Sequence, residues 1–180
     1  MQIKLNLLKN PKEINILGLG RDELLAIMTD FESQPKRASM RVSQIWSWIY
    51  CHGISSFDKM TNIDKNLRSQ LQKVLTVSRP IIEKKEISND GTIKYLFCLE
   101  DRSKIETVFI PEEKRSTLCI SSQVGCTLNC SFCHTGTQKL VRNLSAQEIV
   151  GQVIAVYDDL DLWKKISSSE GVSSFFEVIT

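Results

Sequence analysis

The hydrophobic residues of positions 1–79 recur at the spacing of amphipathic helices. A Leu-Gly-Leu-Gly turn at 17–20 precedes the first stretch, Pro35 separates it from the second, and Gly53 follows the second as a helix-ending residue. The apolar positions of the three stretches are Leu24, Leu25, Ile27, Met28 and Phe31, then Val42, Ile45, Trp46, Ile49 and Tyr50, then Leu67, Leu71 and Leu75. Three short amphipathic helices can bury one another, so residues 1–79 are predicted to form a small helical domain.

The segment after this domain has the alternating pattern of strands. The predicted strands are 81–87, 92–99, 105–110 and 117–122. An Asn-Asp-Gly turn at 89–91 separates the first two and indicates a β-hairpin. The apolar residues expected on one face of its second strand are Ile93, Tyr95, Phe97 and Leu99. Residues 80–116 are therefore predicted to form a β extension of the helical domain.

A further helix is predicted after residue 144. Ser145 followed by Glu148 is a capping box, and the apolar positions expected on one face of the helix are Ile149, Val153 and Val156. The strand at 117–122, a loop and this helix make one βα unit, and the final Glu-Val-Ile-Thr has the character of the start of another strand. Helices, then a hairpin, then a βα unit predict an α+β fold.

Length and composition limit the size of the hydrophobic core and indicate the cellular compartment. With 180 residues, of which 42% are hydrophobic, the chain can bury one ordinary core or two small ones. Residues 1–89 hold fourteen Lys and Arg against nine Asp and Glu, and residues 90–180 hold nine against twelve, so the first half permits contacts with phosphates. No secretory signal or apolar run of membrane-spanning length is present, which predicts a cytoplasmic protein with reduced thiols and no membrane partner.

Aromatic and basic residues in the second helical stretch have two interpretations. As an RNA-binding surface, Trp46 and Trp48 would stack on bases, and Lys36, Arg37 and Arg41 would contact phosphates. As ordinary structure, Trp46 would belong to the core and the basic residues to a solvated face. The residues alone leave both interpretations open.

Three of the six cysteines lie within eight positions, as Cys126, Cys130 and Cys133. Three thiols this close cannot all pair as disulfides, but a Gly-containing loop can wrap them around one soft inorganic centre. An iron–sulfur cluster is favoured, because a structural zinc site closes with four ligands and no second cysteine pair follows. The alternative is a zinc-stabilised RNA-binding module without catalysis, in which His134 is the fourth ligand.

The cysteine loop and its flanks resemble a known family. Phe132, between the last two cysteines, is similar to the aromatic residue in the loop of radical S-adenosylmethionine enzymes and is expected near that cofactor. The segment from Glu106 to Val153, ETVFIPEEKRSTLCISSQVGCTLNCSFCHTGTQKLVRNLSAQEIVGQV, resembles more narrowly the radical-SAM methyltransferases that modify adenine C2 of 23S ribosomal RNA and transfer RNA.

This resemblance implies cofactors, partners and a barrel. The cofactors would be a 4Fe-4S cluster on the three cysteines, with one iron open, and S-adenosyl-L-methionine. The partners would be 23S rRNA and tRNA, which the helical domain would help to bind, and an external electron donor such as a flavodoxin; the protein would be a monomer. Residues 117–180 would begin a radical-SAM (β/α) barrel, with the chemistry at the carboxyl ends of its strands.

The resemblance also changes the interpretation of two residues. By spacing alone, Glu106 is a solvent-facing carboxylate on an edge strand and Cys119 is a small buried residue. In the family pattern, Glu106 matches the general base that removes the C2 proton, and Cys119 matches the cysteine that forms a transient disulfide with a C-terminal cysteine as the product is released. Cys51 and Cys98 match no motif and are expected to be packed or inert thiols.

The chain departs from the family pattern after the cysteine loop. Only 47 residues follow Cys133, so further βα units, the Gly-Glu-Pro stretch of the cofactor site and the methyl-carrying cysteine are not found. Residues 117–180 are therefore predicted to form an incomplete barrel. The chain is expected to be an N-terminal portion of a methyltransferase that does not methylate RNA alone.

Overall fold

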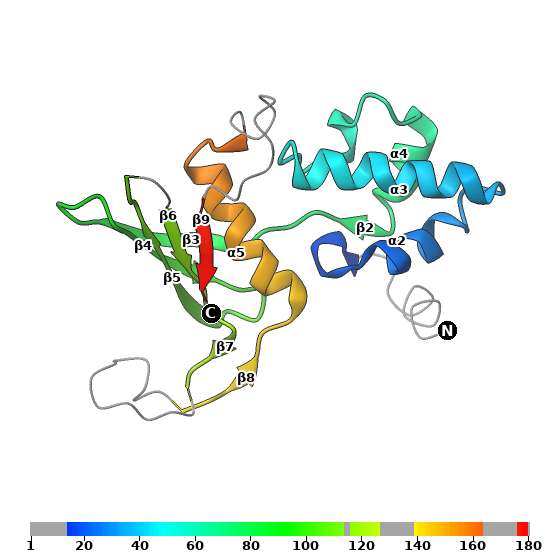
Figure 1. Ribbon diagram of the computed structural model, residues 1–180. Coiled ribbons are helices and arrows are strands. Elements are labelled where there is room, and N and C mark those ends of the chain that lie inside the picture. The colour runs from blue at the N-terminus through cyan, green and yellow to red at the C-terminus, as the bar shows by residue number, and fades with distance from the viewer. Residues whose placement is uncertain (1–13, 114–115, 127–138, 164–175, 180) are drawn as a thin grey trace. The chain divides into compact units, whose positions relative to one another are not determined.

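The protein contains two compact units, each with its own secondary structure (Figure 1). The computed structural model describes residues 14–113, 116–126, 139–163 and 176–179. One unit comprises Met1–Ser78 and Leu160–Ser169, and the other comprises Arg79–Asp159 and Glu170–Thr180. Most of the described helices lie in the first unit, and a five-stranded sheet lies in the second. The domain bounds 1–79, 80–116 and 117–180 stay a prediction.

The first unit is mainly helical. Its elements are η1 (Ile16–Gly18), α2 (Arg21–Met28), α3 (Pro35–Tyr50), η2 (Phe57–Lys59), α4 (Lys65–Leu71) and the paired parallel strands β1 (Ile14–Asn15) and β2 (Leu75–Thr76). The three predicted helices are confirmed. The placement of Leu75 on the third helix was wrong, because α4 ends at Leu71 and Leu75 pairs with Ile14 in the small sheet. The segment after α4 is rich in β-branched residues, which favour a strand.

Local sequence signals explain where these helices begin and end. Pro35 is the first residue of α3, where its missing N–H is not needed. Gly53 has a φ of +65°, and the N–H of Ile54 donates to the carbonyl of Trp48 at 3.0 Å, which ends the helix as predicted. The Asp64 side chain accepts hydrogen bonds from the second and third backbone N–H groups after it and so caps α4.

The second unit is built on a sheet of order β3-β4-β5-β6-β9. Its strands are β3 (Ile81–Ile87), β4 (Ile93–Cys98), β5 (Lys104–Ile110), β6 (Ser116–Cys119) and β9 (Phe176–Ile179). The first four are antiparallel, and β6 and β9 are parallel. The hairpin, the strand at 105–110 and the strand at the end of the sequence are confirmed. The strand predicted at 117–122 is shorter, because its pairing with β5 ends at Cys119.

Helix α5 (Ala146–Asp159) covers one face of this sheet (Figure 1). The sheet residues buried on that face are Ile93, Tyr95, Phe97, Ile105, Thr107 and Leu118. On the helix, Val156 is buried as predicted, but Ile149 and Val153 are half-buried, and Gln152 is fully buried instead. A polar residue holds that position because it is hydrogen-bonded to the sheet. Neither α5 nor any other described helix has the length and apolar character needed to cross a membrane.

Candidate functional site

Two predicted site residues lie on the face of the sheet opposite α5. Residues directly opposite each other in antiparallel strands point to the same face. Leu96 of β4 is opposite Glu106 of β5, and Val108 of β5 is opposite Cys119 of β6. Because Glu106 and Val108 are two residues apart, Glu106 and Cys119 share this face. We define the open face by the side chains of Lys84, Glu86, Lys94, Leu96, Glu106, Val108 and Cys119.

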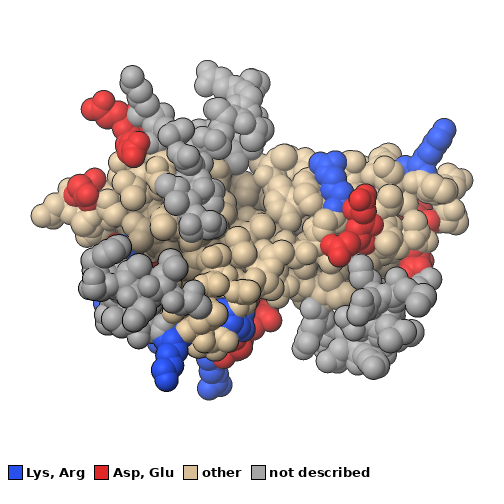
Figure 2. All heavy atoms as spheres, turned by 60° about the horizontal axis from the view of Figure 1, so that its bottom comes forward, with Lys and Arg blue, Asp and Glu red and all other residues tan. Residues whose placement is uncertain are grey.

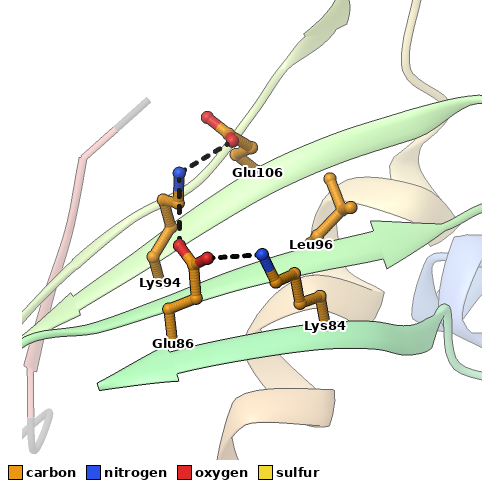
Figure 3. Close-up of a pocket in the computed structure, with 5 residues that line it drawn as sticks. All are labelled: Lys84, Glu86, Lys94, Leu96 and Glu106. Carbon is orange, nitrogen blue, oxygen red and sulfur yellow. Dashed lines mark ion pairs between the residues drawn. The ribbon is translucent and has the colours of Figure 1, made fainter.

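Charges of opposite sign alternate along the open face (Figure 3). Lys84 Nζ lies 2.6 Å from Glu86 Oε1, and Lys94 Nζ lies 3.7 Å from Glu86 Oε2 and 3.3 Å from Glu106 Oε1. With Leu96, these residues line a shallow pocket of about 140 Å³. Glu106 is the main cause of a raised pKa of Lys94, and Lys84 is the main cause of a lowered pKa of Glu86. The side chains are about half exposed, so these pairs orient the groups more than they stabilise the fold.

The positions of Glu106 and Cys119 differ in part from the expectation based on spacing. Glu106 faces solvent, but β5 lies between β4 and β6, so the assignment to an edge strand was wrong. Cys119 is exposed, so the assignment to a buried position was also wrong. The alternation of β6 explains this, because Leu118 and Ile120 occupy the buried side. Cys51 and Cys98 are free and half-buried, and their inertness stays a prediction.

The chain on either side of the cysteine loop forms a narrow antiparallel neck. We define the neck as β7 (Gln123–Val124), Gly125 and residues 139–143, which end in β8 (Arg142–Asn143). The N–H of Val141 donates to the carbonyl of Val124 at 2.8 Å. Gly125 has a φ of +77°, and a Cβ at this position would lie 2.1 Å from the carbonyl oxygen of Lys139. The close approach of the two sides therefore requires glycine at position 125.

Arg142 attaches the neck to two other elements of the second unit. Its guanidinium donates to Glu148 at 2.8 Å and 2.7 Å, in the first turn of α5, and to Asp101 Oδ2 at 2.9 Å and 2.6 Å, in the β4–β5 turn. Glu148 also accepts from the N–H of Ser145 at 2.8 Å, as the predicted capping box requires. Arg142 is the main cause of a lowered pKa of Glu148, and the two carboxylates together raise the pKa of Arg142.

A second attachment joins α5 to the chain just before the neck. The Gln152 side chain binds both the N–H and the carbonyl of Ser121, each at 2.9 Å. The Ser121 hydroxyl donates to the carbonyl of Glu106 at 2.8 Å. Reasoning from sequence missed both Arg142 and Gln152. The signal available for Gln152 was a polar residue within the apolar pattern of a helix.

The proposed cluster ligands lie only partly within the described residues. Cys126 follows Gly125 directly and is half-buried. Phe132 and the remaining candidate ligands, Cys130, Cys133 and His134, lie outside the described residues. Within the described part, no group of three potential metal ligands comes together. The neck nevertheless suits a cluster, because it brings the two ends of a thiol-rich loop together and leaves Cys126 at its rim.

The candidate stacking residues of the first unit already have partners within α3 and its surroundings. Trp46 is half-buried; its ring centroid lies 4.5 Å from that of Tyr50, and the Cζ atom of Arg21 lies 5.0 Å from it. Trp48 is also half-buried, and its Nε1 donates to Asn62 Oδ1 at 2.6 Å. Neither ring is fully buried, so the structure leaves part of each available to a ligand.

The basic candidates of α3 differ from one another. Arg41 pairs with Glu32 at 3.4 Å and donates to Gln44 at 2.9 Å, whereas Lys36 and Arg37 are exposed. On the face of the molecule in Figure 2, the basic side chains of the described residues lie near acidic ones rather than forming a continuous basic area. A role of these residues in RNA binding therefore stays a prediction.

Comparison with known proteins gives matches to both parts of the chain. The family described as "Ribosomal RNA large subunit methyltransferase N-terminal domain" matches residues 14–77. A "Dual-specificity RNA methyltransferase RlmN" from Ruegeria pomeroyi is 54% identical over 150 residues, which are 83% of this chain and 38% of that protein. The protein of the same name from Ruegeria sp. (strain TM1040) is 52% identical over 151 residues, which are 84% and 38% respectively.

A solved structure supports the similarity to methyltransferases. The crystal structure of a radical SAM methyltransferase from Sphaerobacter thermophilus superposes with a TM-score of 0.71 at 35% identity, covering 83% of this chain and 43% of that one. This chain thus spans well under half the length of the relatives that it matches. The resemblance inferred from the cysteine loop is confirmed: this chain is similar to the N-terminal part of the dual-specificity RNA methyltransferases.

Proposed function

We propose that this chain provides the cluster loop and part of the reaction face for radical-SAM methylation of adenine C2 in 23S rRNA and tRNA. One observation carries the proposal: the neck holds the ends of the cysteine loop next to the strand that ends in Cys119. Glu106 lies on the same face of the sheet as Cys119. The neck, Glu106 and Cys119 all belong to the second unit, which supports the proposal.

The cysteine loop would hold the cofactors. Cys126, Cys130 and Cys133 would bind a 4Fe-4S cluster, with Phe132 near S-adenosyl-L-methionine. The cluster and this cofactor would supply the radical chemistry, with electrons from an external donor such as a flavodoxin. The protein would supply thiolate ligands and a fixed position for them, and the neck fits that task because it is closed by backbone pairing and by Gly125.

The exposure of Glu106 and the direction of its side chain support a role toward a substrate above the open face. Its carboxylate lies 3.3 Å from Lys94 Nζ, and about half of its side chain is exposed. A carboxylate that can reach a proton in the bound substrate can serve as a general base. Lys94 would orient the Glu106 carboxylate and would attract a phosphate or a developing negative charge. The role of general base is thus proposed for a residue with suitable direction and access.

Cys119 is proposed to form a transient disulfide with a cysteine outside this chain. Its thiol is exposed at the end of β6, on the face that also holds Glu106. Exchange requires an accessible thiol, and Cys98 and Cys51 are less exposed. Modification by iodoacetamide is therefore expected to be fastest at Cys119 among these three, as measured by mass spectrometry of peptides. Equal rates at all three would argue against a special role for Cys119.

The β6–α5–β9 arrangement supports placing this chemistry at the start of a barrel. Parallel strands joined by a helix that covers one face are the repeating unit of (β/α) barrels. In such a barrel the helices lie outside, so the open face would point to the interior. The first unit would contribute to RNA binding, with Trp48, Lys36 and Arg37 as the first residues to test.

The 180-residue chain alone is predicted not to methylate RNA. It spans 38% of the length of the matched relatives, and the methyl-carrying cysteine of the family pattern has no counterpart in its sequence. Incubation with labelled S-adenosylmethionine, reductant and RNA should give no 2-methyladenine by mass spectrometry of nucleosides. Detection of that product with the purified chain would refute this prediction.

Anaerobic reconstitution with iron and sulfide tests the proposed function. The wild-type chain is expected to gain about four irons and four sulfides and a broad absorption near 400 nm. Cys126→Ala, Cys130→Ala and Cys133→Ala should each lose most of this iron, whereas the matched controls Cys51→Ala and Cys98→Ala should retain it. One zinc without acid-labile sulfide would instead support the zinc-stabilised RNA-binding module, and His134→Ala should then reduce the zinc content.

A further inference from the structure

Gln152 is a fully hydrogen-bonded buried side chain in the contact between α5 and the sheet. It is fully buried, and its carboxamide makes four hydrogen bonds. The oxygen accepts from Thr107 Oγ1 at 2.8 Å and from the N–H of Ser121 at 2.9 Å. The nitrogen donates to the carbonyls of Ser121 at 2.9 Å and Glu148 at 3.1 Å. A carboxamide has two acceptor sites and two donor hydrogens, so all of its capacity is used.

Ser121 occupies the point where the chain leaves the sheet. The pairing of β6 with β5 ends at Cys119, two residues earlier, and Cys126 lies five residues later. Gln152 binds both backbone polar groups of Ser121, as a neighbouring strand would. The Ser121 hydroxyl in turn binds the carbonyl of Glu106. The carboxamide thus takes the place of a strand partner where the ladder stops.

We propose that Gln152 is a positioning residue for the reaction centre described above. By holding Ser121 it fixes the path between Cys119 and Cys126 and the distance of that path from Glu106. The inference rests on the proposed function, because it assigns Gln152 to the support of the cluster loop. Gln152 does not face the open side of the sheet and is not expected to touch substrate or cofactor.

The chemistry of this position supports positioning over simple packing. An apolar side chain would fill the contact between α5 and the sheet without the need to satisfy a carboxamide. It would leave the N–H and carbonyl of Ser121 and the hydroxyl of Thr107 without their present partner. A fully satisfied buried polar group fixes one geometry, because each alternative placement leaves a group unpaired. Compared with an apolar residue, Gln152 therefore gives Ser121 a defined position.

The test compares two substitutions of Gln152 with a matched core control. Gln152→Met keeps a similar length and removes all four hydrogen bonds. Gln152→Glu keeps the acceptors and loses both donations, to the carbonyls of Ser121 and Glu148. Ile154→Ala is the control: Ile154 is buried on the same helix, and no hydrogen bond joins its side chain to Ser121. Each variant is reconstituted anaerobically at a temperature well below its own unfolding midpoint.

The measured quantities separate positioning from stability. Gln152→Met is expected to speed amide exchange at Ser121 about tenfold and to speed loss of the cluster to a chelator about tenfold, with a broadened electron paramagnetic resonance signal of the reduced cluster. Gln152→Glu should change the same quantities in the same direction and by at least as much, because it also buries a carboxylate without a counter-charge. Ile154→Ala should lower the midpoint and leave both rates within about twofold of wild type. If one of the two Gln152 variants does not fold, the other against Ile154→Ala decides the question.

The possible outcomes distinguish failure of the proposed function from failure of the positioning role of Gln152. A wild-type chain that takes up no iron and sulfide refutes the proposed function, and the role of Gln152 falls with it. If the wild-type chain binds a cluster and the Gln152 variants lose theirs no faster, the positioning role is overturned and the proposed function still stands. Equal acceleration in Ile154→Ala also overturns it, because general destabilisation then explains the effect.

Discussion

Substitution of Gly125 by alanine tests whether the neck depends on the close approach of its two sides. The backbone of Gly125 has a φ of +77°, which an L-residue with a Cβ adopts at a cost of about 1–2 kcal/mol. The new Cβ would also lie 2.1 Å from the carbonyl oxygen of Lys139, whereas real Cβ contacts essentially never fall below 3.0 Å. The neighbouring atom is backbone, so it cannot rotate away as a side-chain end would.

The expected cost is the sum of strain and lost pairing. Relief of the contact requires the 139–141 backbone to move, which strains the neck by about 1–3 kcal/mol as overpacking does. This movement also weakens the hydrogen bond between the N–H of Val141 and the carbonyl of Val124, at about 1 kcal/mol. Gly125→Ala should therefore destabilise the neck by roughly 3–6 kcal/mol.

Gly91→Ala is the matched control. Gly91 has a φ of +83°, but its Cβ would meet only the Cγ atom of Pro111, at 3.2 Å. It should therefore cost only the backbone term of about 1–2 kcal/mol. Native-state hydrogen exchange at Val141 measures the opening of the neck, and iron content after reconstitution measures its effect on the loop. Equal losses of iron in Gly125→Ala and Gly91→Ala, or an unchanged rate of amide exchange at Val141 in Gly125→Ala, would refute the reasoning.

Three further predictions concern contacts within the second unit. Arg142→Met should lower the free energy of unfolding by about 1–3 kcal/mol in urea titrations, because it leaves the largely buried Glu148 without its two hydrogen bonds from the guanidinium. An unchanged free energy of unfolding would show that water replaces this pair without cost. Tyr95→Phe should cost about 1 kcal/mol, because the buried ring loses the hydrogen bond from its hydroxyl to Asp159 Oδ2 at 2.8 Å, and an unchanged urea midpoint would contradict this. The pKa of Glu148 is lowered from 4.5 in the folded state, so its contribution to the free energy of unfolding is complete above pH 4.5 and is lost as pH falls through the lower folded pKa. The difference in the free energy of unfolding between wild type and Glu148→Gln should shrink in that acidic range. A constant difference would contradict this prediction.

The sequence predicts those elements whose signals are local. The hairpin follows from an Asp-Gly turn between two alternating stretches, and Gly91 has the positive φ that such a turn needs. The helix end at Gly53 and the cap at Ser145 depend on residues within six positions of each other. These interactions form without reference to the rest of the chain, so a pattern is enough to find them.

The parts that the sequence does not predict depend on distant partners. Asp101 and Arg142 are 41 positions apart, and nothing in either segment alone indicates the pair. Strands β7 and β8 have two residues each, too few for a period to be recognised. Helix α5 appears apolar on the Ile149–Val153–Val156 side, and the burial of Gln152 becomes intelligible only when the backbone of Ser121 lies beside it. The orientation of α5 on the sheet therefore depends on tertiary hydrogen bonds, which the hydrophobic periodicity of the sequence does not reveal.

The site depends most closely on strand register. Side chains alternate along β5, so Thr107 points to α5 and meets Gln152, while Glu106 and Val108 point to the open face. A shift of one residue would place Glu106 beneath the helix, where a carboxylate would replace the hydroxyl that donates to Gln152 and would be buried without a counter-charge. The pairing of Thr107 with Gln152 therefore opposes that register as well as joining helix to sheet. The buried polar contact on one face thus helps to keep Glu106 and Cys119 together on the other.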